Sequence, residues 1–200
     1  AQDSKVEGDW SQAAFWTVGG ALGAGITASG VDFASLQGDK AVVEIMQRMG
    51  ADIAKNADSV TVNSGATQAT IIDASDCPDI IPVLTVLAAV SEGTTKIINA
   101  GRLRIKECDR LAAMTSELNK MGAAITEEPE GLTINGKPEG LRGGVEVDAW
   151  NDHRIAMSLA IAAQCCAEPI TLTGAGSVSK SYPDFWEDYK SVGGKIEVLA

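Results

Sequence analysis

The chain has 200 residues, of which 45% are hydrophobic and 22% charged, and its formal net charge is −11. This composition suffices for a substantial core and gives no sign of disorder. Nonspecific binding to nucleic acid or to an acidic membrane requires a positive field, so the net charge argues against both. No apolar run reaches the roughly 18 residues of a membrane span. The polar residues 1–4 do not resemble the start of a signal peptide.

The four cysteines show neither a CxxC pair nor the spacing of a disulfide framework. Cys165 and Cys166 are adjacent, which is a poor geometry for a bond between them. Free thiols are typical of a reducing compartment. Together with the acidic balance and the absence of a targeting signal, they predict a cytoplasmic location.

A repeat of about 70 residues organises the chain. Each unit is predicted to begin with an apolar helix that follows an aspartate, at residues 10–23, 80–90 and 153–163. Each helix leads to a short strand that ends in glycine, at residues 26–30, 96–101 and 170–174. A second helix then ends at a glycine, and these glycines, 72 and 71 residues apart, are Gly50, Gly122 and Gly193. Further strands with alternating apolar residues are predicted at residues 59–62, 69–72, 132–134 and 144–147.

These units predict an α/β (α+β) fold built from internally repeated sheet-and-helix units. Two helices per unit, beside sheets with one covered face, favour helices packed inside a ring of sheets. The glycines that end the second helices are expected in the left-handed conformation that closes a helix. A Rossmann fold is disfavoured, because no GxGxxG motif follows a predicted strand.

Uncommon residues gather at the starts of the helices, beginning with Asp79 after Pro78. An aspartate at this position is expected as an N-cap or as an acid in the first turn, where it stabilises the N-terminus of the helix. A role in chemistry is the alternative.

Residues 101–110 (GRLRIKECDR) hold four cations and two carboxylates at the entry to the next helix. A helix N-terminus has free N–H groups and a partial positive charge, so basic residues there cost stability. Such cations are explained if an anion occupies the site. A solvated turn with local ion pairs is the alternative.

Residues 151–154 (NDHR) hold the only histidine of the chain, His153, between an acid and Arg154 at another helix start. A purely structural histidine is the alternative. Lys180 lies four residues before Asp184, which precedes the last helix. Taken alone, Lys180 is equally explained as a solvated loop lysine.

The helix starts of successive repeats are expected at the same end of the domain. There, cations would converge beside two carboxylates, and the residues concerned are Lys106, Arg110, Arg154, Lys180, Asp79 and Glu107. Such a concave site suits a ligand with a phosphate and a carboxylate, together with acid–base chemistry. A single histidine without a paired carboxylate–histidine spacing argues against a metal, and no cofactor is predicted.

At these residues the sequence resembles the EPSP (5-enolpyruvylshikimate-3-phosphate) synthase family of enolpyruvyl transferases. The resemblance extends along nearly the whole chain, in residues 6–12 (VEGDWSQ), 78–79 (PD), 101–110, 151–154 and 180–184 (KSYPD). The RIKExDR and DHR blocks together are specific. The sister family that transfers enolpyruvate to UDP-N-acetylglucosamine and the RNA 3′-phosphate cyclases share related architectures without these blocks.

The resemblance implies a two-domain enzyme whose domains are inside-out α/β barrels, each made of three sheet-and-helix units. Members transfer the enolpyruvyl group of phosphoenolpyruvate to the 5-hydroxyl of shikimate 3-phosphate and release phosphate, without a metal. The reaction is an addition followed by an elimination through a tetrahedral ketal, so positioned charges do most of the catalysis. Glyphosate is the family's known inhibitor and is implied for this chain.

The resemblance also implies catalytic roles for two carboxylates. Asp79 would hold the shikimate hydroxyls and assist deprotonation of the attacking one. Glu107 would transfer protons at the methylene carbon of phosphoenolpyruvate, with His153 in support. Cys108 stands where a serine or threonine is common, which affects only the fine geometry of its loop.

The binding roles implied by the resemblance belong to four cations. The phosphate and carboxylate of phosphoenolpyruvate would bind to Arg110, Arg154 and Lys180. Shikimate 3-phosphate would contact Lys106.

The chain is about half the family's length, and the family's N-terminal Lys-Ser dyad, arginines and Ser-Ser-Gln segment lie before it. The resemblance assigns residues 1–36 to a remnant of the shikimate-phosphate-binding domain and residues 37–200 to the C-terminal domain. The remnant is expected to pack unusually or to pair between chains. The chain is expected to need the N-terminal half of the same enzyme as its partner and to turn over poorly alone. The alternatives are an anion-binding module without turnover, a structural domain with solvated basic loops, and a relative of the UDP-N-acetylglucosamine enzymes.

Overall fold

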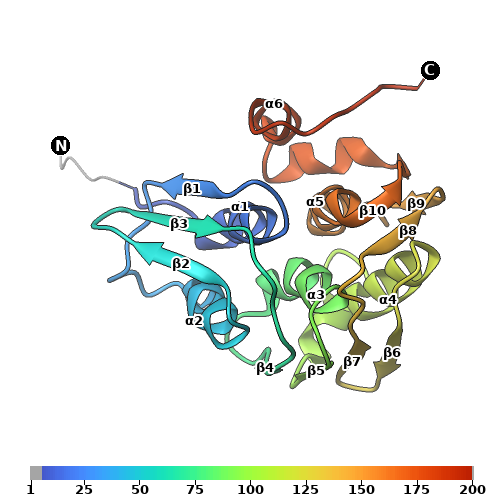
Figure 1. Ribbon diagram of the computed structural model, residues 1–200, viewed down its shortest axis with the longest axis horizontal. Helices are drawn as coiled ribbons and strands as arrows, with labels where there is room; N and C mark the ends of the chain where they lie inside the picture. Colours follow the sequence, from blue (N-terminus) through green and yellow to red (C-terminus); the bar gives the residue numbers. More distant parts are fainter. Residues whose placement is uncertain (1–5, 200) are drawn as a thin grey trace.

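The structure, a computed structural model, describes residues 6–199, so the polar start at residues 1–4 lies outside the described residues. Three inner helices form the centre of the fold, and they are α1 (Trp10–Leu22), α3 (Ile81–Ala89) and α5 (His153–Ala162). Figure 1 shows them near the middle of the molecule, with the strands and the other helices around them. Between residues 6 and 199, no helix is long and apolar enough to cross a membrane.

The sequences of the inner helices explain why they lie inside. All nine residues of α3 (IPVLTVLAA) and all ten of α5 are buried. A helix that is apolar on every side has to be surrounded by other elements. The helices pack against one another, and the sheets cover them from outside, so the predicted inside-out arrangement of an α/β fold is confirmed.

Four sheets lie around the inner helices. The first is antiparallel, with strand order β1 (Ile26–Ser29), β3 (Ser59–Asn63), β2 (Asp52–Lys55). The largest has the order β4 (Ile71–Asp73), β5 (Thr94–Ile98), β7 (Gly131–Asn135), β6 (Ile125–Glu128). The other two are parallel pairs, β8 (Leu141–Gly143) with β10 (Cys166–Glu168) and β9 (Glu146–Asp148) with β11 (Thr171–Thr173). The strands predicted at residues 59–62 and 69–72 therefore belong to different sheets.

The second helix of each repeat lies on the outside, where Figure 1 shows the three well apart. These helices are α2 (Ala41–Arg48), α4 (Arg110–Lys120) and α6 (Phe185–Ser191). The predicted terminal glycines all have positive φ, 85° at Gly50, 105° at Gly122 and 99° at Gly193. Glycine takes this left-handed conformation without a Cβ penalty, so it can end each helix and turn the chain toward the next strand.

Short 3-10 helices complete the fold. They are η1 (Gly38–Lys40), η2 (Pro78–Ile80), η3 (Gly101–Ile105), η4 (Ala163–Cys165) and η5 (Ala175–Lys180). The turns η1 and η2 directly precede α2 and α3, and η3 ends shortly before α4 begins. Asp79 lies in η2, Lys106 and Glu107 follow η3, and Lys180 ends η5.

The packing shows no break at the boundary predicted between residues 36 and 37. Helix α1 contacts α3 and α5, and β1 pairs with β3 along its whole length. Phe15 and Trp10 are fully buried in the same hydrophobic core as the later repeats. The expectation of unusual packing is therefore not met, because residues 6–36 supply one of the three inner helices. Their origin in a second domain stays a prediction.

Replacing Phe15 by alanine tests whether α1 belongs to the cooperative core. Phe15 is completely buried, so the loss of its ring is expected to cost about 3–5 kcal/mol of unfolding free energy in a single transition. Denaturant unfolding followed by circular dichroism measures this. Leu36→Ala is the control, since Leu36 is 99% exposed and should change stability by less than about 0.5 kcal/mol. An unchanged main transition in Phe15→Ala would mean that residues 6–36 form a separate unit.

Candidate active site

The predicted site residues lie where α3, α4 and α5 begin. Asp109 and Asp152 are N-caps, since their carboxylates accept hydrogen bonds from the backbone N–H groups of Ala112 (3.1 Å) and Arg154 (2.8 Å). Asp79 differs from them, because it lies inside the 3-10 turn η2, which has no side-chain cap. Of its two expected structural roles, the N-cap is therefore wrong, whereas the acid in the first turn is confirmed for η2. Its carboxylate remains available to other side chains.

Arg110 is the centre of the site. Its side chain is only 1% exposed, and each of its three guanidinium nitrogens has a carboxylate partner. Nη1 donates to Asp79 at 2.8 Å, Nη2 to Glu107 at 2.6 Å, and Nε to Asp152 at 2.8 Å. These charge-assisted bonds satisfy a cation that could not be buried alone. Burial by itself lowers the pKa of Arg110, but the hydrogen bond and charge of Asp152 raise it overall, so Arg110 is fully charged.

Asp79 binds two further cations. Lys106 Nζ lies 3.2 Å from one of its oxygens and Arg154 Nη2 lies 3.5 Å from the other. Burial raises the pKa of Asp79, but the charges of Arg154, Lys106 and Arg110 outweigh it and leave the pKa below its ordinary value. Asp79 is therefore ionised at neutral pH. The side chain of Asp79 is 28% exposed, so it can still accept a hydrogen bond from a ligand.

The cluster of six residues is electrically balanced. Its three carboxylates (Asp79, Glu107, Asp152) face three cations (Lys106, Arg110, Arg154). The sequence predicted that the cations would converge beside Asp79 and Glu107, and the structure brings these five residues together. The surplus of positive charge expected for an anion site is absent from the cluster, because a buried arginine needs counter-charges within contact.

Lys180 and His153 lie at the edge of this cluster. Lys180 Nζ donates to the backbone oxygen of Asn151 and, at 2.7 Å, to its side-chain oxygen, and so contacts the chain next to the site rather than a carboxylate. His153 is buried, and its nearest acidic atom belongs to Asp152, 3.9 Å from Nδ1. Burial and the charge of Arg154 lower the pKa of His153, so the ring is neutral at pH 7. No direct bond joins His153 to Glu107 among residues 6–199.

Asp152 is the site residue that sequence reasoning missed. It is fully buried, caps α5 and binds Arg110 through both oxygens, at 2.8 and 3.4 Å. Asp152 occupies the same position in its repeat as Asp9 and Asp79 do in theirs. That position predicted the start of a helix but not an ion pair. Cys108 Sγ lies 3.7 Å from the same carboxylate. Burial and the charge of Asp152 raise the pKa of Cys108 to about 12, so this thiol stays protonated.

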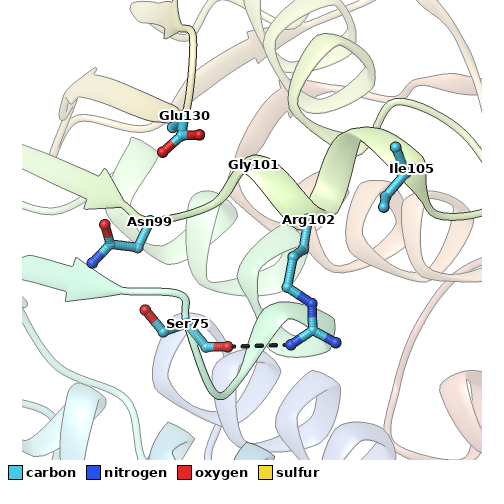
Figure 2. A pocket seen from close by; sticks show the side chains of 6 residues that line it. All are labelled: Ser75, Asn99, Gly101, Arg102, Ile105 and Glu130. Atoms are coloured by element: carbon cyan, nitrogen blue, oxygen red, sulfur yellow. Dashed lines mark hydrogen bonds between the residues drawn. The ribbon is translucent and has the colours of Figure 1, made fainter.

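A shallow pocket of about 550 Å³ is lined in part by residues 101, 102 and 105, which precede Lys106 of this cluster in the sequence. Figure 2 shows Arg102 from η3 reaching across it to the backbone oxygen of Ser75, at 3.5 Å, with Glu130 on the other side. Ile105 lines the same pocket and is 85% exposed. The residues bound to Arg110 do not line this pocket. In the described part of the chain, no group of three or more His, Cys, Asp or Glu residues is arranged to hold a metal ion.

An inside-out repeat with charged side chains at its helix starts defines an enolpyruvyl-transferase type of domain. The profile of EPSP synthase (3-phosphoshikimate 1-carboxyvinyltransferase) matches residues 1–189, and the chain belongs to this family. Two curated relatives, the 3-phosphoshikimate 1-carboxyvinyltransferases of Clostridium kluyveri and Clostridium beijerinckii, are 55% and 57% identical over 195 and 197 residues. The chain spans about half the length of these relatives, since the matches cover 98% of this chain and 45% of each of them.

Solved structures agree with this assignment. EPSP synthase from Acinetobacter baumannii superposes with a TM-score of 0.88 at 32% identity, over 98% of this chain and 48% of that one. The enolpyruvyl transferase NikO from Streptomyces tendae has a TM-score of 0.81 over 98% of this chain and 45% of that one. Its identity is 24%, so it supports the fold alone.

Asp152→Asn tests the ion pair at the centre of the site. Asparagine caps a helix as well as aspartate does, so the substitution removes charge without removing the cap. It leaves Arg110 without the charge of its one fully buried partner, and we expect a loss of about 3 kcal/mol of unfolding free energy. Asp9→Asn is the matched control, because Asp9 caps α1 through Ser11 and Gln12 and has no ion pair among the described residues. Its cost should stay below about 0.5 kcal/mol. Equal costs for the two variants would contradict a special role of the ion pair.

The same pair predicts a pH dependence. Burial raises the pKa of Asp152, but the hydrogen bond and charge of Arg110 lower it overall. A depressed native pKa adds stability that is present above the unfolded value, about 3.9, and is lost as the pH falls through the native value. The difference in stability between the wild type and Asp152→Asn should therefore shrink as the pH drops from about 5 to 2. Urea unfolding at a series of pH values measures it, and a constant difference would contradict the assignment.

Proposed function

We propose that this chain supplies one half of the active site of a 3-phosphoshikimate 1-carboxyvinyltransferase. The reaction transfers the enolpyruvyl group of phosphoenolpyruvate to the 5-hydroxyl of shikimate 3-phosphate and releases phosphate. The observation that carries this proposal is the contact of one buried arginine, Arg110, with Asp79, Glu107 and Asp152 at three helix starts. The four cysteines are all free, which agrees with a proposed cytoplasmic location.

In the proposed mechanism, Asp79 and Glu107 handle the substrate protons. Asp79 is ionised and partly exposed, so it can accept a hydrogen bond from the attacking hydroxyl and take up its proton. The hydroxyl oxygen bonds to C2 of phosphoenolpyruvate while C3 gains a proton, which gives the tetrahedral ketal. The C2–O bond to phosphate then breaks and C3 loses a proton. Glu107, whose side chain is 43% exposed, is the group proposed to give and remove the proton at C3.

The cations are proposed to hold the substrate anions. Arg110, Arg154 and Lys180 would bind the phosphate and carboxylate of phosphoenolpyruvate, and Lys106 would bind shikimate 3-phosphate. His153 is buried and neutral next to Asp152 and would support the acid–base residues as an uncharged polar group. Positioning and fixed charge would supply the catalysis, with no cofactor or metal.

Charge balance supports the proposal that the N-terminal half of the enzyme completes the site. The cluster has no net charge, whereas both substrates are anions. Additional cations must therefore come from outside it, and Lys180 provides only one. Glyphosate, which also carries a phosphonate and a carboxylate, is the inhibitor proposed for the completed site.

A phosphate-release assay tests this function directly. The purified chain is mixed with phosphoenolpyruvate and shikimate 3-phosphate, with and without the separately expressed N-terminal half of a close relative. We expect release only in the mixture, and inhibition by glyphosate. Binding of phosphoenolpyruvate without turnover in any mixture would favour an anion-binding module. Activity with UDP-N-acetylglucosamine in place of shikimate 3-phosphate would favour the sister family.

Glu107→Gln tests the proton-transfer role in the active mixture. The amide keeps the size of the side chain but cannot exchange a proton, so kcat is expected to fall at least about 100-fold. Glu44→Gln is the control, because Glu44 lies on the outer helix α2, where its exposed side chain forms an ion pair with Arg48. That variant should keep the wild-type kcat. A Glu107→Gln enzyme with normal kcat would exclude Glu107 as the proton-transfer group.

A further inference from the structure

Glu117 is a buried carboxylate that the proposed reaction does not use. It lies on α4, seven residues after Arg110 and therefore on the same face of the helix, and it is only 1% exposed. A charge in this position costs free energy unless it is bonded. Burial raises the pKa of Glu117, but bonds from Lys120, Trp150 and Asp148 lower it overall, so it stays ionised.

Two partners of Glu117 lie at the end of β9 and in the loop that leads from β9 to α5. Oε1 accepts a hydrogen bond from the indole N–H of Trp150, in the loop, at 3.0 Å. Oε2 accepts one from the backbone N–H of Asp148, the last residue of β9, also at 3.0 Å. One buried carboxylate therefore fixes the backbone where the loop begins and a side chain within the loop. Lys120, at 2.7 Å, supplies the counter-charge from the surface.

This loop has an uncommon backbone. Trp150 and Asn151 have φ values of 50° and 52°, so two successive residues with side chains are left-handed. Such residues persist only where their surroundings hold them in place, and they concentrate at functional sites. The backbone N–H of Trp150 donates to Asp148 Oδ1 at 2.6 Å, and Glu117 holds the ring.

The left-handed turn places two residues that belong to the site. Asn151 holds Lys180 through two oxygens, and Asp152, the next residue, binds Arg110. Asp152 N also donates to Ala149 O at 2.9 Å, which closes the turn. One helix therefore holds the loop from both sides, through Arg110 at its start and Glu117 two turns later.

We propose that Glu117 is a positioning residue for the phosphoenolpyruvate side of the site. Through Trp150 it holds the left-handed turn that sets the places of Lys180 and Asp152. This inference rests on the proposed function for its effect on catalysis, while the positioning itself concerns only contacts within this chain.

Asn119 on the same helix provides a matched control. Its amide bonds both backbone groups of Ile125, at 2.9 Å each, and so ties α4 to the start of β6, a strand that carries none of the site residues. Glu117→Ala and Asn119→Ala each remove two hydrogen bonds from α4 to a neighbouring segment. A general loss of stability is expected from both variants, so it does not distinguish them.

Amide hydrogen exchange in the isolated chain tests the positioning. Glu117→Ala should speed exchange at the amides of Trp150, Asp152 and Arg154 at least about 10-fold, and Asn119→Ala should leave these amides unchanged. Trp150→Phe, which removes only the indole donor, tests the same point if Glu117→Ala fails to fold. Unchanged exchange at Asp152 and Arg154 in Glu117→Ala and Trp150→Phe would overturn the proposal.

Kinetics of the two-half mixture provide the second test. Trp150→Phe and Glu117→Ala should raise KM for phosphoenolpyruvate about 10-fold and leave KM for shikimate 3-phosphate within twofold. Equal changes in both KM values, or the same changes in Asn119→Ala, would overturn the positioning role and leave the proposed function intact. An inactive wild-type mixture would count against the proposed function alone, since the exchange experiment does not depend on turnover.

Discussion

The burial of Arg110 is the constraint on which the rest of the site depends. A guanidinium that is 1% exposed requires acceptors close to its nitrogens, and three carboxylates from three different helix starts provide one for each nitrogen. The starts of α3, α4 and α5 must therefore meet at one end of the fold. The burial of every residue of α3 and α5, most of them apolar, brings this about, since it places the two helices side by side in the centre.

Charge balance follows from the same constraint. Each cation within contact of the cluster is matched by a carboxylate, so the free site is stable without a ligand. An anionic substrate therefore either competes with Asp79 and Glu107 for these cations or binds to cations from outside the cluster. The chain spans about half of its relatives' length, which agrees with the proposal that a second half supplies further cations.

The three repeats use one position for different purposes. Asp9 and Asp152 cap their helices. Asp79 instead lies after Pro78 in a 3-10 turn, and its carboxylate forms ion pairs with cations. Proline fixes the first turn and lacks an N–H that would need a cap, which frees the aspartate.

The sequence by itself determined the repeat, the two helices of each unit, the inside-out α/β class and the family. Apolar periodicity and the glycines after each second helix mark the elements, and the RIKExDR and DHR blocks point to the family. The sequence also predicted that Asp79, Glu107, Lys106, Arg110, Arg154 and Lys180 converge, and the structure brings the first five together and places Lys180 at their edge.

Only the tertiary structure decided which charges neutralise one another. Local signals placed Asp152 at a helix start and did not single out Glu117. Both are buried and bonded to residues 31 to 42 positions away. Burial and pairing at such distances depend on how helices from separate repeats pack, and no local pattern contains that information.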